Sequence, residues 1–240
     1  MTFQQLVKWR PSPLSPEVPD THGTTVIALR YAEGVVILAD RRATMGNLIM
    51  YDQAEKIGAI DNSTLLAISG SFARAIEAIR MLKHSFKYYR RAQMVEMSVE
   101  GKLQEIGRSV AANMAASMEG VGIYIPIVAT YDKPKDEFLI YFFDGAGARF
   151  PHPHYAAAGS GSERIRGMFD YITRTKPAWE KRPLADVLGD GLTMLDIAAD
   201  LDSATGGWNK VLPSAYVLTR EGAAKVEDAV LRKAADAARR

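Results

Sequence analysis

The sequence contains no cysteine, which excludes disulfide bonds, thiolate metal sites and a cysteine nucleophile, and fits a reducing compartment. No apolar run reaches the ~18–20 residues that a membrane-spanning helix needs. The first 23 residues lack the hydrophobic stretch of a secretory signal. We therefore expect a cytoplasmic protein without a membrane partner.

The chain also lacks an excess of charge of either sign. The chain has 30 basic and 28 acidic residues, a formal net charge of +2. Such a mixed-sign surface argues against a nucleic-acid partner. Apolar residues make up 48% of the 240 residues, and no linker composition interrupts the middle of the chain. These observations predict one large domain with ample material for a core.

The N-terminal 23 residues differ from the rest of the chain. They hold four closely spaced prolines, Pro11, Pro13, Pro16 and Pro19. Proline prevents helix formation and removes main-chain donors from a strand. We expect this leader to pack poorly on the domain that follows it.

Two short apolar runs, residues 23–31 and 34–44, follow the leader and are rich in β-branched residues. Runs of this kind, bounded by glycine, predict strands, and the short Ala32-Glu33-Gly34 link predicts a hairpin. Their apolar residues are nearly continuous, so we expect both faces of the sheet to be covered. Thr24 lies directly after Gly23 at the head of the first strand. Taken alone, a threonine there is most often an ordinary strand or turn residue.

The remaining pattern predicts an α+β fold. A turn is expected at 45–47 and an extended segment over 48–56; further strands are expected at 56–60, 64–70, 124–131, 138–143, 154–158 and 214–219. Periods near 3.6 predict helices from Ser71 (stripe Phe72, Ile76, Ile79, Leu82, Phe86), from Ser98 (stripe Leu103, Ile106, Val110, Met114, Met118), over 163–173 and over 183–200. Residues 222–240 are expected to form an amphipathic or frayed basic tail. The grouping predicts a four-layer α/β/β/α sandwich of two antiparallel sheets flanked by helices.

Six motifs in order carry a resemblance to a known family. They are His22-Gly23-Thr24-Thr25; Gly34-Val35-Val36 with Asp40-Arg41-Arg42-Ala43-Thr44 and Gly46-Asn47; Lys56; Ser69-Gly70-Ser71; Gly159-Ser160-Gly161-Ser162; and Asp202-Ser203-Ala204-Thr205-Gly206-Gly207. In this order the chain resembles the β-subunits of bacterial, actinobacterial-type proteasomes, which are N-terminal-nucleophile hydrolases.

The resemblance implies a threonine endopeptidase made as a zymogen. Residues 1–23 would be a propeptide removed by autocatalytic cleavage between Gly23 and Thr24, and residues 24–240 the peptidase domain. It also implies heptameric β rings between rings of α-subunits in a four-ring core, an ATPase unfoldase ring acting through the α ring, unfolded protein substrates and no cofactor.

The resemblance also assigns catalytic residues. Thr24 would supply both the attacking hydroxyl and, once freed, an α-amine whose reference pKa of about 7.7–8.0 suits a general base. Lys56 would favour the neutral amine, with Asp40 holding Lys56 and Arg42 supporting Asp40. The main-chain N–H of Gly70 would stabilise the oxyanion. Residues matching hydrogen-bond partners of the Thr24 amine and hydroxyl are Ser160, Asp202 and Thr205.

Substrate would lie as an added strand against Thr44 and the Gly70 segment. The side-chain pocket implied by the resemblance is lined by Ala43, Ala54 and Ile68, which predicts a preference for hydrophobic residues before the cut. Phe72, bulky where the family usually has a small residue, is expected to narrow this cleft.

Three other hypotheses stay open at this level. The chain could be a catalytically inactive ring subunit, the peptidase subunit of a related ATP-dependent protease, or a small-molecule amidase of the same fold that acts outside a barrel. His152 and His154 lack a third ligand nearby, so no metal site is expected. Gly145-Ala146-Gly147 lacks the rest of a dinucleotide-binding fingerprint.

Overall fold

A computed structural model describes residues 23–45, 48–118 and 122–238. Its two main sheets each have five strands, in the orders β10-β1-β2-β11-β12 and β5-β6-β7-β8-β9, and the neighbouring strands pair antiparallel. The first sheet contains β1 (Val26–Tyr31), β2 (Gly34–Ala39), β10 (Tyr155–Ala158), β11 (Ser214–Leu218) and β12 (Ala223–Lys225). The second contains β5 (Ile57–Asp61), β6 (Thr64–Gly70), β7 (Tyr124–Asp132), β8 (Glu137–Phe143) and β9 (Arg149–His152). A separate two-stranded ribbon is formed by β3 (Ala43–Met45) and β4 (Leu48–Tyr51).

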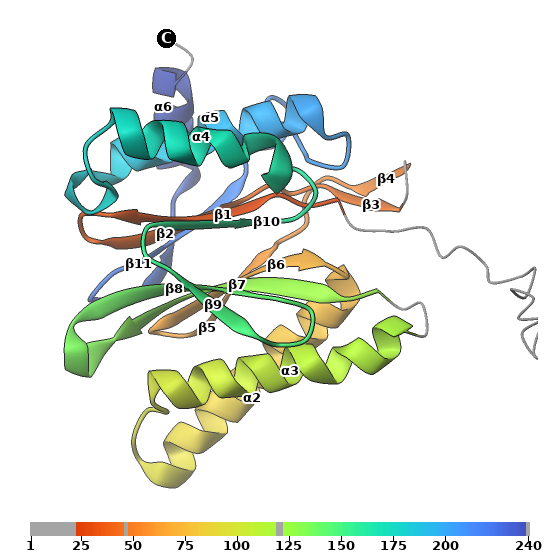
Figure 1. The fold of residues 1–240 in the computed structure, drawn as a ribbon, viewed down its shortest axis with the longest axis vertical. Coiled ribbons are helices and arrows are strands. Elements are labelled where there is room, and N and C mark those ends of the chain that lie inside the picture. The colour runs from red at the N-terminus through yellow and green to blue at the C-terminus, as the bar shows by residue number, and fades with distance from the viewer. Residues whose placement is uncertain (1–22, 46–47, 119–121, 239–240) are drawn as a thin grey trace, which may run out of the picture.

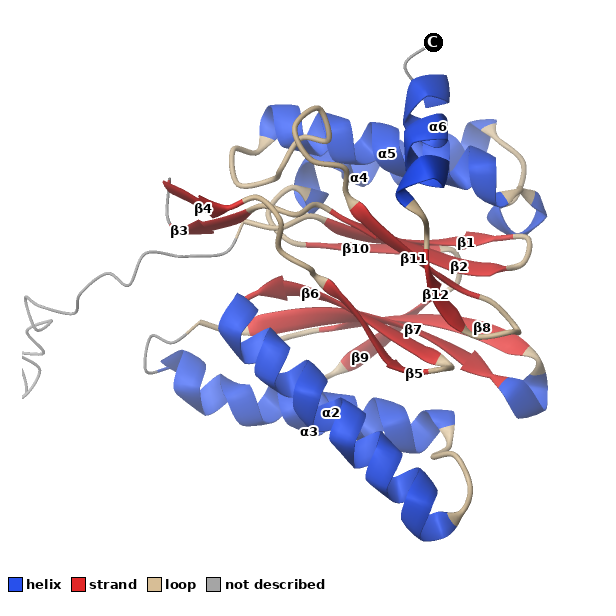
Figure 2. Ribbon diagram, turned by 180° about the vertical axis from the view of Figure 1, so that it is seen from behind, coloured by secondary structure: helices blue, strands red, loops and turns tan. Residues whose placement is uncertain are grey.

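Helices lie on the outer side of each sheet, as Figures 1 and 2 show. The first sheet is covered by α4 (Ser162–Thr175), α5 (Leu184–Leu201) and α6 (Asp228–Ala238), and the second by α2 (Phe72–Gln93) and α3 (Val99–Met118). Two short 3₁₀ helices, Lys133–Lys135 and Trp179–Lys181, complete the regular elements of the described residues. None of the helices in the described part of the chain is long and apolar enough to cross a bilayer.

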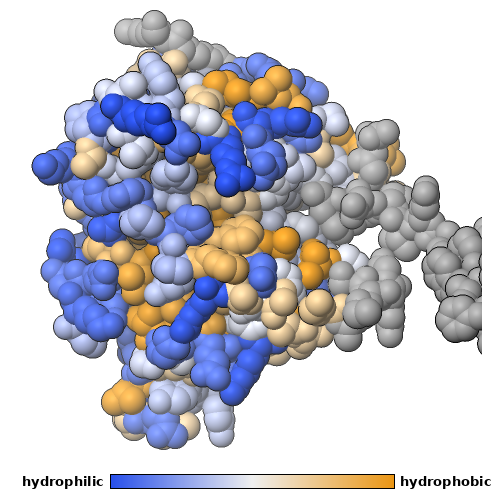
Figure 3. All heavy atoms as spheres, in the orientation of Figure 1, coloured by the Kyte–Doolittle hydropathy of each residue, from blue (hydrophilic) through white to orange (hydrophobic). Residues whose placement is uncertain are grey.

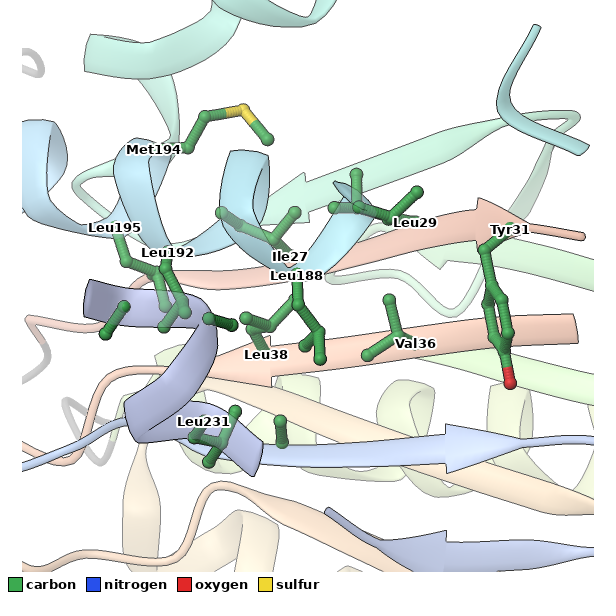
Figure 4. Close-up of a cluster of buried hydrophobic side chains, with 14 of the residues drawn as sticks. Ile27, Leu29, Tyr31, Val36, Leu38, Leu188, Leu192, Met194, Leu195 and Leu231 are labelled. Atoms are coloured by element: carbon green, nitrogen blue, oxygen red, sulfur yellow. The ribbon is translucent and has the colours of Figure 1, made fainter. Parts of the chain in front are cut away.

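The apolar runs of β1 and β2 are buried on both faces. Ile27, Leu29 and Tyr31 pack toward α4 and α5 in one cluster, drawn in Figure 4, while Val26 and Ala28 pack toward the second sheet in another. A third cluster fills the space between the second sheet and the helices α2 and α3. Because side chains alternate along a strand, a continuous apolar run supplies two packed interfaces at once.

The prediction of an α+β fold with antiparallel sheets is confirmed, as is the β1–β2 hairpin, and the strands predicted at 56–60 and 64–70 form the antiparallel pair β5–β6. Thr24 and Thr25 precede β1 instead of belonging to it. The leader, apart from Gly23, and the predicted turn residues Gly46 and Asn47 lie outside the described residues.

Of the two alternatives predicted for residues 222–240, the amphipathic one is confirmed over the described residues, since β12 pairs with β11 and α6 buries Leu231, Ala234 and Ala235 against α5. Two other local features differ from the predictions. Strand β9 was not predicted, and it extends the second sheet at β8. Met114 was expected on the buried face of α3 but is 44% exposed.

Candidate active site

The predicted catalytic residues come together at one end of the two sheets. Antiparallel pairing places the start of β1 beside the ends of both β2 and β10, since Val26 pairs with Ala39 and with Ala158. Asp40 therefore follows β2 next to Thr24 and Thr25. Lys56 precedes β5 and Gly70 ends β6. The loops after β10 and after α5 bring in Ser160, Asp202 and Thr205, as the contacts described next establish.

A buried ion pair joins Lys56 to Asp40. Lys56 Nζ lies 2.7 Å from Asp40 Oδ1, and the two side chains are 2% and 0% exposed. The same carboxylate accepts main-chain N–H bonds from Thr25 at 2.8 Å, from Arg42 at 2.9 Å and from Gly206 at 2.9 Å. Burial lowers the pKa of the Lys56 ammonium below its ordinary value, and the nearby Asp40 carboxylate opposes this shift.

The Gly23 carbonyl lies between the threonine and the lysine. Thr24 Oγ1 donates a hydrogen bond to Gly23 O at 2.6 Å, and Lys56 Nζ lies 3.4 Å from the same oxygen. Gly23 N donates to Thr44 Oγ1 at 3.3 Å. The hydroxyl of Thr24 is therefore held against the peptide group that the sequence analysis predicts to be cut.

A second cluster is built around Asp202. Its Oδ2 accepts hydrogen bonds from Ser160 Oγ at 2.6 Å and from Thr205 Oγ1 at 2.7 Å, and its Oδ1 accepts one from the N–H of Ala204 at 3.2 Å. Thr25 Oγ1 lies 2.7 Å from Thr205 Oγ1. Sequence reasoning did not select Thr25 as a functional residue, although its position beside Thr24 was a signal.

Arg42 acts on Asp40 through its main chain. Its guanidinium instead forms an ion pair with Asp52 at 3.0 Å and donates to the carbonyls of Ser203 at 3.0 Å and Thr205 at 3.2 Å. Arg42 thus contacts Asp40 as expected, but through its main-chain N–H, while its guanidinium fixes the loop that carries Asp202 and Thr205.

Close packing explains two of the glycines in the motifs. A Cβ at Gly23 would lie 1.7 Å from the Cβ of Ala204, so no side chain fits there. Gly159 has φ +96°, and a Cβ on it would lie 1.9 Å from Thr24 O. Glycine is therefore required both at the residue before Thr24 and in the loop that packs against the Thr24 carbonyl.

Two clefts meet at Gly23. The larger, of about 890 Å³, extends toward β10 and α4, and the smaller, of about 500 Å³, extends toward the start of α2. The smaller cleft is lined by Gly23, Thr24, Arg42, Ala43, Thr44, Met45, Lys56, Gly70, Ser71, Phe72, Ala73, Arg74 and Glu77.

The predicted pocket residues are only partly at these surfaces. Ala43, Thr44 and Phe72 line the smaller cleft, whereas Ala54 and Ile68 are 2% exposed and line neither cleft. Ile68 packs into the cluster beneath α2 and α3. The structure therefore does not place Ala54 and Ile68 at the wall where they were expected.

The β3–β4 ribbon leaves the body of the fold next to this site. Thr44 and Met45 on β3 line the smaller cleft. The large apolar residues of the ribbon are 43% to 59% exposed: Met45, Leu48, Ile49, Met50 and Tyr51. Hydrophobic residues also reach the surface in Figure 3 on the side where the ribbon projects in Figure 1.

His152 and His154, the two histidines considered as metal ligands, have different surroundings. His152 lines the larger cleft, and His154 Nδ1 lies 2.7 Å from Glu180 Oε1. Within the described ranges, no group of three or more His, Cys, Asp or Glu residues is arranged to hold a metal ion.

The comparisons with known proteins agree with one another. The profile of the family described as "Proteasome subunit" matches residues 20–182. The "Proteasome subunit beta" of Acidimicrobium ferrooxidans is 34% identical over 228 residues, which cover 92% of this chain and 80% of the relative. That of Streptomyces griseus is 32% identical over 219 residues, covering 90% and 76%. The "Proteasome subunit beta 2" of Thermomonospora curvata is 34% identical over 210 residues, covering 86% and 72%. The chain belongs to the proteasome subunit family.

Proposed function

We propose that the chain is a proteasome β-subunit: a threonine endopeptidase with the four-layer fold of the N-terminal-nucleophile hydrolases. Residues 1–23 are a propeptide removed by the chain itself, and residues 24–240 form the peptidase domain. The observation that carries the proposal is the contact of Thr24 Oγ1 with Gly23 O at 2.6 Å, beside the buried ammonium of Lys56. The names of the relatives support the β-type assignment.

Self-cleavage follows from this contact. The Thr24 oxygen attacks the Gly23 carbonyl carbon, the Gly23–Thr24 C–N bond breaks, and the nitrogen takes up the proton, which leaves an ester. Water then hydrolyses the ester, releasing the Gly23 carboxylate and restoring the hydroxyl. Lys56 Nζ, 3.4 Å from the carbonyl oxygen, stabilises the negative charge that develops there. The product is a free α-amine on Thr24.

Peptide hydrolysis by the mature chain uses the same groups. The freed amine accepts the Thr24 hydroxyl proton, the oxygen attacks the substrate carbonyl, and the new amine end leaves with that proton. The Gly70 N–H donates a hydrogen bond to the oxyanion and stabilises it. The cationic Lys56, held by Asp40, favours the neutral form of the amine through electrostatic repulsion. Water completes the cycle by hydrolysing the ester.

The substrate is an unfolded polypeptide bound as an extended strand along Thr44 and Gly70. We retain the prediction that a hydrophobic residue precedes the cut, since Ala43, Met45 and Phe72 line the smaller cleft. Arg74 and Glu77 in the same wall form an ion pair at 3.3 Å and so offer little net charge. Fluorogenic peptides test this: faster release after an acidic or basic residue contradicts it.

The chain acts within an assembly. The proposed partners are other β-subunits in a heptameric ring, α-subunits in a four-ring core and an ATPase ring bound to the α ring, all in the cytoplasm. Family membership supports a ring assembly. A native mass close to that of a single chain after co-expression with α-subunits contradicts this part and favours the amidase hypothesis.

Intact mass of the co-expressed protein tests the whole proposal. Loss of residues 1–23 is expected, together with peptide hydrolysis, and Thr24→Ala is expected to abolish both. Thr175→Ala, at the exposed end of α4, is the matched control and is expected to behave as wild type. An intact leader on an assembled, inert particle contradicts the proposal, and a cleaved but inert particle favours the inactive ring subunit.

A further inference from the structure

Thr25 connects the two clusters of the site. It is fully buried. Its N–H donates to Asp40 Oδ1 at 2.8 Å, and the N–H of Asp40 donates back to Thr25 O at 3.1 Å. The main chain of Thr25 therefore belongs to the Asp40–Lys56 cluster, while its side chain belongs to the Asp202 cluster.

The direction of the side-chain hydrogen bonds follows from proton counting. Asp202 is a carboxylate and accepts only, so Thr205 must use its single hydroxyl proton in the 2.7 Å bond to Asp202 Oδ2. The 2.7 Å contact between the Thr25 and Thr205 hydroxyls then has Thr25 as the donor. Thr25 therefore donates a hydrogen bond to Thr205, and Thr205 donates one to Asp202. Ser160 donates to the same carboxylate oxygen.

The neighbouring loop leaves this hydroxyl pair little freedom. A Cβ added to Gly161 would lie 2.1 Å from Thr25 Oγ1 and 2.7 Å from Thr205 Oγ1. The main chain at Gly161 therefore covers the pair directly. Such packing holds each hydroxyl in one orientation, which is the condition for a fixed relay.

We propose that Thr25 is a positioning residue: its hydroxyl orients Thr205 and thereby Asp202 and Ser160 around the Thr24 nucleophile. This inference rests on the proposed function. The side chain of Thr25 acts through Thr205 and makes no contact of its own with the reacting Gly23 carbonyl. Its loss is expected to slow the chemical step and to leave substrate binding unchanged.

The test compares Thr25→Val, Thr25→Ser and wild type in the assembled particle, with kcat expressed per processed N-terminus from intact mass. Thr25→Val keeps the shape and removes the hydroxyl; we expect kcat to fall about tenfold, the size of one hydrogen bond, with KM unchanged. Thr25→Ser restores the donor and is expected to recover kcat to within about threefold of wild type.

Thr64→Val is the matched control. Thr64 and Thr130 form another fully buried hydroxyl pair, at 3.3 Å, and Thr64 lies at the opposite end of β6 from Gly70. Its kcat is expected to equal that of wild type. The double variant Thr25→Val/Thr205→Val is expected to be no slower than Thr205→Val alone, because the two residues act in series.

Several outcomes overturn the inference. A wild-type kcat in Thr25→Val, a Thr25→Ser variant as slow as Thr25→Val, or additive losses in the double variant each do so. Should Thr25→Val fail to assemble, Thr25→Ala, which removes the hydroxyl without adding bulk, replaces it: a tenfold loss of kcat at unchanged KM supports the inference, and a wild-type kcat overturns it. An inert wild-type particle instead contradicts the proposed function itself.

Discussion

The protein contains two lysine–aspartate pairs in which the lysine is buried and the N–O distances are almost identical, but the burial of the aspartate differs. Lys56 Nζ lies 2.7 Å from Asp40 Oδ1, and Lys102 Nζ lies 2.6 Å from Asp61 Oδ2. The lysine side chains are 2% and 3% exposed, whereas Asp40 is 0% and Asp61 is 25% exposed. Burial of the lysine and a close carboxylate partner therefore do not by themselves distinguish the predicted catalytic lysine from the other one.

The surroundings of the two ammonium groups differ. Lys102 also donates to Ser63 Oγ at 2.8 Å and lies 5.9 Å from the centre of the Phe86 ring, so it joins α3 to the β5–β6 turn and to α2. Lys56 instead reaches the Gly23 carbonyl and lines the smaller cleft. What separates Lys56 from Lys102 is therefore its contact with the Gly23 carbonyl, at the bond where we propose cleavage.

The largest effect that this comparison predicts is on Lys56→Met. Removing the cation beside the Gly23 carbonyl is expected to slow both leader removal and peptide hydrolysis by about 1000-fold, the range of a lost catalytic group. Intact mass follows the first reaction and a fluorogenic peptide the second. Hydrolysis within tenfold of wild type would place Lys56 with the structural lysines.

Lys102→Met is expected to lower the stability of the protein and to leave its activity unchanged. It leaves Asp61 without its cation; because this carboxylate is 25% exposed, the cost is expected to lie below that of a fully buried pair, at about 2 kcal/mol. For a chain of this size the thermal midpoint is expected to fall by about 4–8 °C. The kcat per processed N-terminus is expected to stay at the wild-type value. An unchanged midpoint, or a lower kcat in the intact assembly, contradicts the structural role.

Gly23→Ala tests the carbonyl that makes Lys56 different. A Cβ at this position would lie 1.7 Å from that of Ala204, so the Gly23 peptide must shift away from Ala204 and leave its present position beside Thr24 and Lys56. A displacement of about 1 Å is expected to slow leader removal by about 100-fold. Residue 23 leaves with the leader, so the kcat of fully processed particles is expected to be unchanged.

Gly167→Ala provides the control for that variant. Gly167 lies within α4, and a Cβ there would meet nothing within 4 Å. Processing at the wild-type rate is expected. If Gly23→Ala were processed as fast as this control, the close approach of Gly23 to Ala204 would have no role in placing the carbonyl.

The same comparison explains what the sequence could predict. Asp40 and Lys56 stand beside glycine-bounded β-branched runs, and the motifs of the family identify them. Lys102 and Asp61 carry no such signal: one is a helix residue and the other a turn residue, positions where charge is usually solvated. Only the packing of α3 against the β5–β6 turn shows that they are paired and that Lys102 is buried.

The other differences have the same origin. Helix α6 buries mainly small residues, Ala234 and Ala235 beside Leu231, so its sequence alone left open whether the segment packs or frays. The role suggested here for Thr25 depends on its contact with Thr205, 180 positions away in the chain. Ala54 and Ile68 were assigned to the pocket wall by resemblance, but the depth of a side chain beneath a surface is set by tertiary packing.

A third ion pair, between Arg220 and Asp136 at the surface, is expected to have the smallest effect on the protein when it is broken. Arg220 donates to both carboxylate oxygens of Asp136, at 2.7 and 2.9 Å, and Tyr131 donates to one of them at 2.7 Å. The bond from Arg220, followed by that from Tyr131, lowers the pKa of Asp136 from 3.8 to about 2. Because the folded-state pKa is below the unfolded-state value, the stabilisation is present above pH 3.8 and is lost as the pH falls through about 2.

Arg220→Gln is therefore expected to raise the pKa of Asp136 toward 3.8, measured by NMR titration of its carboxyl group. Arg108→Gln, which removes the exposed partner of Glu105, is expected to leave that titration unchanged. Neither variant is expected to alter kcat, since solvent screens an exposed pair. An unshifted Asp136 in Arg220→Gln would mean that Tyr131 alone holds the carboxylate.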